Sequence, residues 1–253
     1  MRCDPHYRPA ADLLKDRVIL ITGAADGLGR ATAKACARHG ATLILLGRTI
    51  RKLEKIYDEI CAAGGPDPAI YPMNLEGAAP KDYADLAATL ESEFGRLDGL
   101  VHNAAELGTP SPLDASNIET WYKVLQVNLH APFLLTHACL PLLRKSADAS
   151  VVFIGDAVGR KAKAYSGAYA VSKFGLEGLM QVLADETENS GILRSNSFDP
   201  GILNTALRRR GYPAENYAAN PAPDSAVPGL LYLLGPDSRG VTGQSWVWSP
   251  AVD

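Results

Sequence analysis

The stretch "RVILITGAADGLGR", residues 17–30, decides the fold of this chain. Its first half is an apolar, β-branched run that is typical of a buried strand. Its second half contains Gly23, Gly27 and Gly29 and opens a helical pattern that continues to His39. Glycines here permit a sharp turn, a close backbone approach to phosphate and tight helix packing, and a helix N-terminus attracts anions. The stretch therefore predicts a nucleotide-phosphate site, and the alternative is an ordinary glycine-rich turn between strand and helix.

The same alternation of apolar runs and helical patterns continues along the chain. Strands are predicted at 17–23, 41–47, 69–75, 97–104, 150–155, 192–198 and 243–248, and helices at 27–39, 49–62, 80–94, 117–144, 166–188 and 224–234. We expect the helix over 117–144 to bend near Pro132. Near-continuous apolar strands between helices indicate a parallel sheet covered on both faces, and right-handed crossovers make it doubly wound. The prediction is a single-domain Rossmann-type α/β fold of about seven strands with helices on both faces.

Two segments stand outside this alternation. Residues 1–14 form a polar N-terminal extension that contains Pro5 and Pro9 and is not typical of a signal peptide. Residues 203–222, "LNTALRRRGYPAENYAANPA", are rich in Pro, Asn and Ala and long for a connection. Long loops in compact domains are commonly functional or mobile. We predict a substrate flap at this place, with a mobile surface loop as the alternative.

Composition and charge argue against several classes of function. The 253 residues carry a formal net charge of −3, whereas proteins that bind nucleic acid have a basic excess. No apolar run is long enough to span a membrane. The four cysteines are scattered without a C-x-x-C pair, which favours reduced, mostly buried thiols and no structural metal. These features predict a soluble cytoplasmic protein with neither a nucleic-acid partner nor a membrane partner.

The end of the second predicted strand indicates which dinucleotide binds. In dinucleotide-binding folds an acidic residue at this point holds the ribose 2′-hydroxyl of NAD, whereas an arginine accommodates the 2′-phosphate of NADP. The sequence "LLGRT" has Gly47 and Arg48 here and no acid. This favours NADP(H), although Asp26 stands where a basic residue would strengthen the assignment. The alternative is that Arg48 is an ordinary surface charge.

A tyrosine and a lysine lie four residues apart in "GAYAVSK", residues 167–173. This spacing places Tyr169 and Lys173 on one face of a helix. A phenol titrates near pH 10, and a neighbouring ammonium group favours the tyrosinate and lowers that value. The pair can therefore serve as a general acid or base, although the same spacing also occurs in plain surface pairs. The pair supports a catalytic role here because it follows a predicted strand and lies downstream of the glycine-rich turn in the sequence.

Taken together, these motifs resemble the short-chain dehydrogenase/reductase family, in its NADP-preferring form. The resemblance covers nearly the whole chain, from about residue 15 to residue 250, and rests on the glycine motif, on "NL", "HNAA" and "QVNLHAPF", on "GAYAVSK" and on "DPGILNT". It implies contacts to the cofactor from the glycine-rich turn, from the strand ends and from the helix that carries the tyrosine. The residues concerned are Gly23, Ala25, Asp26, Gly27, Leu28, Gly29, Arg48, Asn74, Leu75, Asn103, Ala104, Ala105, Tyr169, Lys173, Pro200, Gly201, Ile202 and Thr205.

The resemblance also implies roles at the reacting centre. Tyr169 matches the family's proton donor, and Lys173 matches the residue that lowers the pKa of that tyrosine and contacts the nicotinamide ribose. Asn128 matches the residue that supports a water in the proton relay. A homodimer or homotetramer built from the helices around 117–144 and 166–188 is a further implication.

The sequence departs from the family's pattern at three positions. Asn74 replaces an aspartate, and Ala105 replaces a glycine beside the cofactor. More important for the chemistry, Asp156 aligns with the catalytic serine, and the nearest hydroxyl before Tyr169, that of Ser166, lies on a different segment. An ionised carboxylate accepts hydrogen bonds and cannot donate one, and it repels a tyrosinate. An ionised Asp156 is therefore expected to raise the pKa of the tyrosine and to slow carbonyl reduction.

Three other arrangements of Asp156 stay open. The carboxyl group can be protonated by burial and then donate a hydrogen bond as serine does. It can turn toward Lys173, Arg160 or Lys161 and leave the reacting centre. It can also simply cap the turn after the fifth strand, as aspartate often does.

We therefore predict an oxidoreductase that transfers hydride between NADP(H) and a small carbonyl or alcohol substrate, with Tyr169, Lys173, Asn128 and Asp156 as its catalytic residues. One alternative is an NADP(H)-binding protein with weak or no turnover because Asp156 replaces the serine. Another is a non-redox enzyme such as a lyase or a dehalogenase, which the intact phosphate turn and Lys173 argue against.

Two histidines and a run of arginines are better explained as structural or surface features than as parts of a site. His102 and His137 lack a second ligand at a suitable spacing, so we predict structural histidines and no metal site. The run "LRRRG", residues 207–211, is suited to clamp an acidic substrate, but a charge run is more often a solvated face.

Overall fold

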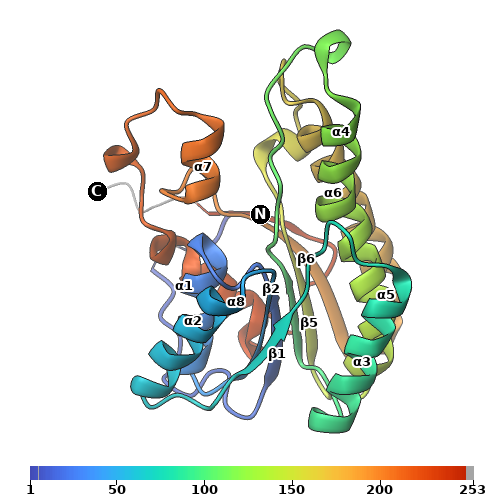
Figure 1. Cartoon of the computed structure of the whole chain (residues 1–253). Helices are drawn as coiled ribbons and strands as arrows, with labels where there is room; N and C mark the ends of the chain where they lie inside the picture. Colours follow the sequence, from blue (N-terminus) through green and yellow to red (C-terminus); the bar gives the residue numbers. More distant parts are fainter. Residues whose placement is uncertain (5, 249–253) are drawn as a thin grey trace.

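The structure is a computed structural model of the chain, and it describes residues 1–4 and 6–248. Its centre is a seven-stranded parallel sheet with the strand order β3-β2-β1-β4-β5-β6-β7 (Figure 1). The strands are β1 (Val18–Thr22), β2 (Thr42–Gly47), β3 (Ala69–Pro72), β4 (Gly99–His102), β5 (Ala149–Ile154), β6 (Leu193–Asp199) and β7 (Ser245–Val247). The Rossmann-type doubly wound sheet predicted from the sequence is confirmed.

Helices cover both faces of this sheet, as Figure 1 shows. One face carries α1 (Gly27–Arg38), α2 (Ile50–Ala62) and α8 (Val227–Leu234). The other face carries α3 (Pro80–Phe94), α4 (Ile118–Leu125), α5 (Ala131–Leu143) and α6 (Gly167–Thr187). The short helix α7 (Ala206–Gly211) lies apart from both layers, beyond the carboxyl ends of the strands.

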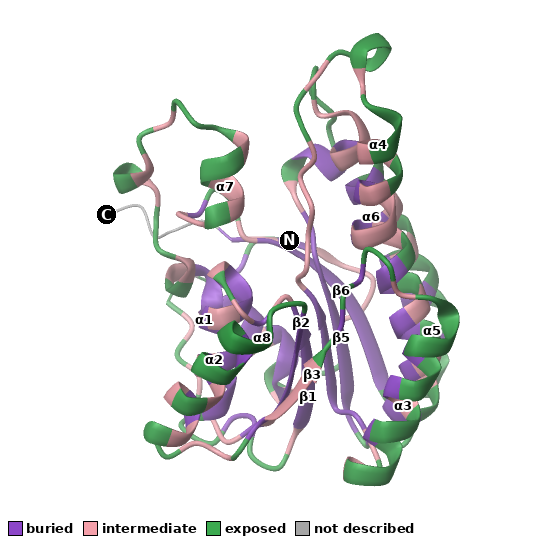
Figure 2. Cartoon of the chain, viewed as in Figure 1, coloured by how far each residue is buried: buried purple, intermediate pink, exposed green. Residues whose placement is uncertain are grey.

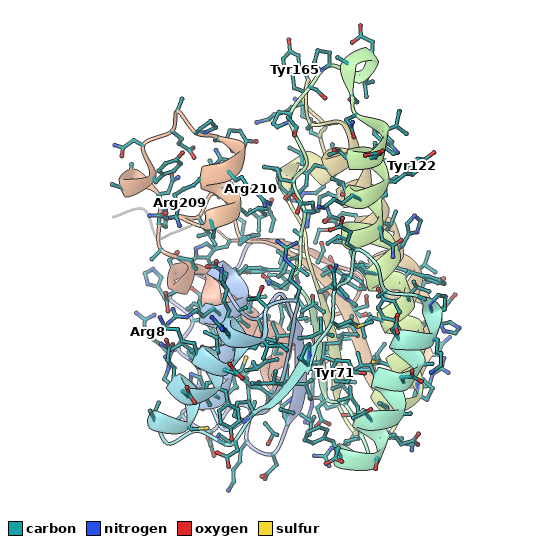
Figure 3. All side chains as sticks on the ribbon, viewed as in Figure 1. Arg8, Tyr71, Tyr122, Tyr165, Arg209 and Arg210 are labelled. Carbon is teal, nitrogen blue, oxygen red and sulfur yellow. The ribbon has the colours of Figure 1, made fainter. Side chains whose placement is uncertain are left out.

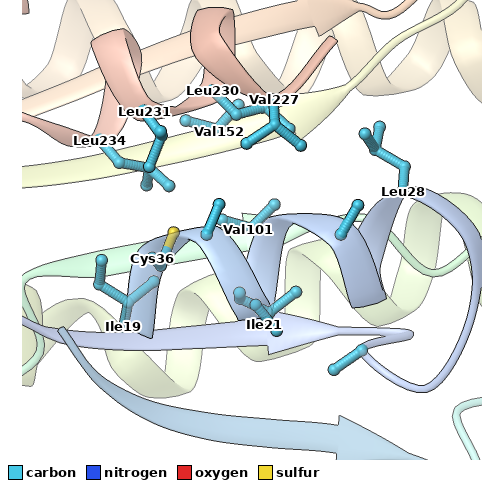
Figure 4. Close-up of a cluster of buried hydrophobic side chains, with 14 of the residues drawn as sticks. Ile19, Ile21, Leu28, Cys36, Val101, Val152, Val227, Leu230, Leu231 and Leu234 are labelled. Atoms are coloured by element: carbon cyan, nitrogen blue, oxygen red, sulfur yellow. The ribbon is translucent and has the colours of Figure 1, made fainter. Parts of the chain in front are cut away.

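A hydrophobic core fills the space on each side of the sheet. Ile19 and Ile21 of β1 pack with Cys36 of α1 and Leu230 of α8 in the first core (Figure 4). Leu20, between them in sequence, points to the second core, because successive side chains of a strand alternate between faces. All five residues of β1 are buried (Figure 2). This double coverage explains why the strands read as continuous apolar runs rather than as alternating ones.

The predicted helix over residues 117–144 is divided in the structure. α4 ends at Leu125, a π-helical turn covers Gln126–His130, and α5 begins at Ala131. The structure thus places the irregularity in the turn before Pro132 rather than at the proline itself. A proline lacks the N–H that bonds the carbonyl four residues earlier, and its ring clashes with that carbonyl, so a wider turn forms ahead of it.

The two segments outside the main alternation also have defined structure. Arg2 pairs with Val247 beside the edge strand β7, and the Cys3 backbone N–H donates to the Val247 carbonyl oxygen at 3.1 Å. Residues 203–222 contain α7 where the sequence predicted only an irregular connection, and Thr205 caps this helix by accepting from the Arg208 N–H at 3.1 Å. None of the described helices has the length and apolar character that a membrane crossing requires.

A cluster of charged side chains lies at the amino ends of the strands. The carboxylate of Asp148, just before β5, pairs with Arg17 at 2.9 Å, with Arg194 of β6, and with Arg239 at 3.3 Å. The side chains of Asp148 and Arg194 are only 8% and 5% exposed. The cluster links β1, β5, β6 and the segment after α8. It lies at the amino ends of the strands, whereas ligands bind at the carboxyl ends in such folds.

Candidate active site

A cleft of about 500 Å³ opens at the carboxyl ends of the strands, where β1 and β4 are neighbours although they are not consecutive. Ligands bind at this reversal of strand order in open α/β sheets. Of the predicted site residues, only Gly29 and Asn128 lie outside the cleft wall. The others all line it: Gly23, Ala25, Asp26, Gly27, Leu28, Arg48, Asn74, Leu75, Asn103, Ala104, Ala105, Asp156, Tyr169, Lys173, Pro200, Gly201, Ile202 and Thr205.

The glycine-rich turn after β1 leaves no room for side chains at its key positions. Gly23 and Gly27 have φ angles of 64° and 50°, which favour glycine. A Cβ atom on Gly29 would lie 2.4 Å from both the Gly23 carbonyl oxygen and the Asn103 side chain. Gly29 therefore packs behind the turn, and the turn presents backbone to the cleft. The cradle fits the pyrophosphate of a dinucleotide at the start of α1.

Asn103 ties the end of β4 to this turn. Its Nδ2 donates to the carbonyl oxygens of Thr22 at 2.9 Å and Gly23 at 3.2 Å. The Thr22 Oγ1 accepts from the backbone N–H groups of Asn103 and Ala104, both at 3.0 Å. The two sides of the crevice are thus linked across β1 and β4.

Positive charge gathers beyond the end of β2. Arg48 is exposed there, and Lys52 in the first turn of α2 also lines the cleft. The Lys52 Nζ lies 3.4 Å from Asp26 Oδ2 and so offsets the carboxylate that stands beside the phosphate turn. Asp26 itself caps α1 by accepting from the Gly27 N–H at 2.8 Å. This part of the cleft presents two cationic side chains, rather than an acid, to a ligand.

Tyr169 and Lys173 lie on one face of α6, and both reach the cleft. The Lys173 ammonium donates to the Ile154 carbonyl oxygen at 2.6 Å and lies 5.6 Å from the centre of the Tyr169 ring. Burial lowers the pKa of Lys173 to about 8, against the opposing effect of nearby carboxylates. Burial raises the pKa of Tyr169 well above its ordinary value, and the Asp156 carboxylate raises it further. The phenol is therefore protonated at neutral pH.

Asp156 follows β5 closely, and its carboxylate has two hydrogen-bond partners. Oδ1 accepts from the Val158 backbone N–H at 2.9 Å. Oδ2 accepts from the Tyr169 hydroxyl at 3.1 Å. The capping role and the contact with the tyrosine, which the sequence presented as alternatives, therefore coexist in one side chain.

Arg160 and Ser166 both have other partners, so Arg160 does not bind Asp156 and Ser166 does not take its place beside Tyr169. The Arg160 guanidinium lies 3.1 Å from Glu177 on α6 and 2.5 Å from Asp199 at the end of β6. The Ser166 hydroxyl donates to the Lys163 carbonyl oxygen at 2.5 Å in the loop before α6. The alternative in which Asp156 turns toward Arg160 is therefore wrong for this structure, because that guanidinium already has two carboxylate partners.

A glycine allows Asp156 to approach the tyrosine. Gly159, in the turn that Asp156 caps, lies directly on α6. A Cβ atom on Gly159 would stand 2.8 Å from the Lys173 Cβ and 2.9 Å from the Lys173 carbonyl oxygen. The absence of a side chain thus sets the distance between the turn and the helix that carries Tyr169.

Asn128 lies behind the cleft wall, in the π turn, and its amide is used within the protein. Oδ1 accepts from the Glu106 N–H at 2.7 Å, while Nδ2 donates to the Glu106 carbonyl oxygen at 2.8 Å and to Ser172 Oγ at 3.0 Å. The side chain therefore holds the segment after β4 against α6. Its support of a relay water stays a prediction.

The arginines of the predicted flap are paired within the protein. Arg208 makes a two-pronged contact with Glu215, both bonds at 2.7 Å, and its guanidinium lies 3.6 Å from the Tyr212 ring centre. Arg210 lies 3.0 Å from Glu106, across the cleft from α7. Arg209 and Arg210 both project from α7 in Figure 3. Ion pairing within the chain therefore uses two of the three charges considered for an acidic substrate.

His102 is a structural residue, as the sequence predicted. Its Nε2 lies 2.8 Å from Thr136 Oγ1, and its ring stacks on Phe153 with 4.8 Å between the ring centres. Burial lowers the pKa of His102 to about 3, so the imidazole is neutral. Within residues 1–4 and 6–248, no group of three or more His, Cys, Asp or Glu side chains is placed to hold a metal ion.

Comparison with known proteins assigns the chain to a family. The family model described as short chain dehydrogenase matches residues 17–216. The chain belongs to the short-chain dehydrogenase family. This short-chain dehydrogenase is 44% identical over 245 residues to the uncharacterized oxidoreductase YciK of Escherichia coli (strain K12), a match that covers 97% of this chain and 96% of that protein.

Solved structures of short-chain dehydrogenases resemble the whole fold. One from Pseudomonas syringae has a TM-score of 0.95 at 50% identity and covers 98% of this chain and 99% of that chain. One from Shigella flexneri 2a str. 301, complexed with NADP, has a TM-score of 0.92 at 43% identity, with 94% and 99% covered. The protein is accordingly an oxidoreductase of this family.

Some residues of this short-chain dehydrogenase's cleft were absent from the sequence prediction. Lys52 was detectable in principle, because it lies four residues after Arg48 at the start of a helix. Glu106, Leu107 and Tyr212 also line the cleft, and no local spacing connects them to it.

Proposed function

We propose that this protein is an NADP(H)-dependent oxidoreductase that interconverts a small alcohol and its carbonyl compound. The observation that carries the proposal is that one cleft joins a glycine cradle and the cations Arg48 and Lys52 to the pair Tyr169 and Lys173. The NADP complex of the Shigella flexneri relative supports the choice of cofactor.

The residues of the cleft fit such a cofactor in their chemistry. The turn that contains Gly23 and Gly27 would hold the pyrophosphate, Arg48 and Lys52 the 2′-phosphate, and the segment Pro200–Ile202 the nicotinamide end. When bound, the nicotinamide supplies a two-electron hydride donor or acceptor. The protein supplies orientation and proton transfer, the latter through the Tyr169 hydroxyl.

The cofactor assignment is tested by calorimetric titration of NADPH and NADH. We expect NADPH to bind more tightly, and Arg48→Ala to remove most of that difference. Arg51→Ala is the matched control, because Arg51 is also exposed at the start of α2 but does not line the cleft. Equal affinities for both cofactors in the wild type would refute the assignment.

The reaction is tested with a panel of alcohols and ketones, following the absorbance of the reduced nicotinamide. A second function, an NADP(H)-binding protein with little turnover, is favoured by the presence of Asp156 where the family has its serine. Tight NADPH binding without turnover of any member of the panel would support that second function.

We also propose a homodimer or homotetramer. The exposed sides of α4, α5 and α6 carry large apolar side chains, among them Ile118, Tyr122, Phe133, Phe174 and Val182. Tyr122 projects outward from α4 in Figure 3. Light scattering after size-exclusion chromatography measures the assembly, and a monomer at micromolar concentration would contradict it.

A further inference from the structure

The hydrogen bond between Tyr169 and Asp156 has a direction, and that direction matters for catalysis. The carboxylate can only accept, so the phenol proton points from Tyr169 to Asp156 Oδ2 across 3.1 Å. The phenol oxygen then has lone pairs free to accept from another donor. Because both residues line the open cleft, a substrate hydroxyl can be that donor.

The tyrosine of this site is not suited to work as a tyrosinate. Burial and the adjacent carboxylate both hold it in the protonated form. The ammonium of Lys173 is bonded to the Ile154 carbonyl oxygen and lies over the ring rather than at the hydroxyl. A base that accepts a proton from an alcohol at neutral pH must therefore be a different group, and the Asp156 carboxylate touches the phenol.

We propose that Asp156 is the terminal proton acceptor of this site and that Tyr169 relays the proton to it, so that the site is arranged for alcohol oxidation at neutral pH. The proposal rests on the proposed function. The alcohol O–H proton passes to the Tyr169 hydroxyl oxygen while the phenol proton passes to Asp156 Oδ2. The carbinol carbon gives its hydride to an oxidised nicotinamide dinucleotide, and the C=O bond forms. Tyr169 carries no net charge before or after the step, and the Asp156 carboxylic acid then releases its proton to water in the cleft.

Other titratable groups face this pair from α6 itself and from two further elements. Lys173 and Glu177 lie on α6, Asp199 ends β6, and Arg208 and Tyr212 belong to the α7 region. Arg208 is held by Glu215, and Glu177 and Asp199 are held by Arg160.

These partners restrict which group can act as the base. Each of the carboxylates of Glu177, Asp199 and Glu215 has a guanidinium partner. Asp156 has hydrogen-bond donors only, and one of them is the phenol that would deliver the proton.

The same arrangement predicts slow carbonyl reduction at neutral pH. In the reverse direction Asp156 must carry a proton before Tyr169 can give its own to the forming alkoxide. Both hydrogen-bond partners of Asp156 in this structure donate to it, as they do to a carboxylate that carries no proton. The rate of carbonyl reduction by the wild type should therefore increase as the pH falls. The rate of alcohol oxidation should change little with pH through the neutral range.

Two substitutions at position 156 distinguish the role of Asp156 as proton acceptor from its role in capping the Val158 N–H. Asp156→Asn keeps the shape and an oxygen that can cap the Val158 N–H, but its amide cannot take up the proton. Asp156→Ser also keeps a capping oxygen and restores the hydroxyl of the family pattern. Turnover of one alcohol with NADP⁺ and of its ketone with NADPH is measured from pH 5.5 to 9 in the three proteins.

We expect Asp156→Asn to lose about 10²-fold or more in oxidation at pH 7, which is the scale of a positioned general base. Oxidation by Asp156→Ser should rise with pH, and its reduction at pH 7 should exceed that of the wild type. Variants that oxidise the alcohol as fast as the wild type, with the same pH profile, would overturn the proposal.

A spectroscopic measurement tests the proposal independently of turnover. Ultraviolet titration of each protein, with the Tyr169→Phe form subtracted, isolates the ionisation of the Tyr169 phenol. We expect it to ionise at lower pH in Asp156→Ser than in the wild type, and ionisation at the same pH in both would refute the coupling. Because this readout needs no substrate, it can refute the coupling on which the inference depends even where no alcohol in the panel is turned over, an outcome that would count against the proposed function alone.

Discussion

The substitution Asp148→Asn removes the single carboxylate at the centre of the charge cluster at the strand starts. Its side chain contacts Arg17, Arg194 and Arg239, and two of these guanidinium groups are largely buried, with Arg17 12% and Arg194 5% exposed. Loss of one partner of a buried pair leaves an uncompensated charge and costs about 3–5 kcal/mol. In a chain of this length that corresponds to a fall in Tm of roughly 6–20 °C.

Urea unfolding followed by circular dichroism measures this loss. Asp85→Asn is the matched control, because it removes an aspartate paired with Lys81 at i,i+4 on the exposed surface of α3, where solvent screens the pair and its contribution is small. The cluster lies at the edge of the sheet away from the cleft, so NADPH affinity should be unchanged at a temperature where both proteins are folded. Equal destabilisation by the two substitutions would refute the reasoning.

The effect should also depend on pH. Burial alone would raise the pKa of Asp148, but Arg194 and Arg17 outweigh it and lower the pKa below the ordinary value. The stabilisation is therefore fully present above the ordinary aspartate pKa, near 3.9, and is lost as the pH falls through the lower pKa of the folded state. The difference in unfolding free energy between wild type and Asp148→Asn should shrink in that acid range.

Three further outcomes are expected. Tyr169→Phe should reduce turnover by roughly 10²–10⁴-fold while it keeps NADPH binding, and unchanged turnover would exclude the phenol as the proton-transfer group. Gly29→Ala should abolish NADPH binding or folding, because its Cβ would lie 2.4 Å from a backbone oxygen, whereas Gly77→Ala, at an exposed glycine whose added Cβ meets nothing within 4 Å, should fold as the wild type does. Arg210→Ala should expose residues 203–222 to proteolysis at most about fivefold faster, since a partly exposed pair with Glu106 contributes up to about 1 kcal/mol, and a much larger increase would mean that this contact alone holds α7.

The sheet and its order of elements were predictable from the sequence because burial on both faces requires apolar residues at consecutive positions, which is a local pattern. A parallel strand such as β1 is apolar at every position, and the helices between strands keep their own period. The glycine-rich turn was predictable for the same reason, since backbone conformation at Gly23 and Gly27 is a local property. The division between α4 and α5 was only partly predictable, because Pro132 signals an irregularity without setting the turn that absorbs it.

The side-chain contacts in and around the site were not predictable because they join residues that are distant in sequence. Glu106 and Arg210 are separated by 104 positions, and Arg160 and Asp199 by 39. No spacing or composition connects such pairs until the sheet brings them together. Asp156 was the intermediate case: its place in the motif was readable, but its simultaneous contacts with Val158 and Tyr169 depend on how the turn packs on α6.

The packing of Gly159 on α6 has a consequence for how this enzyme can evolve. The turn is kept against the helix by a missing side chain, and Asp156 needs only one oxygen to cap it. Position 156 therefore accepts Asp, Asn or Ser with little change in scaffold, and each choice gives the neighbouring phenol a different partner. Position 159 accepts no such exchange, because any added carbon would move the turn away from α6. A substitution at position 156 can therefore change the partner of the phenol without changing the scaffold, whereas Gly159 holds that scaffold in place.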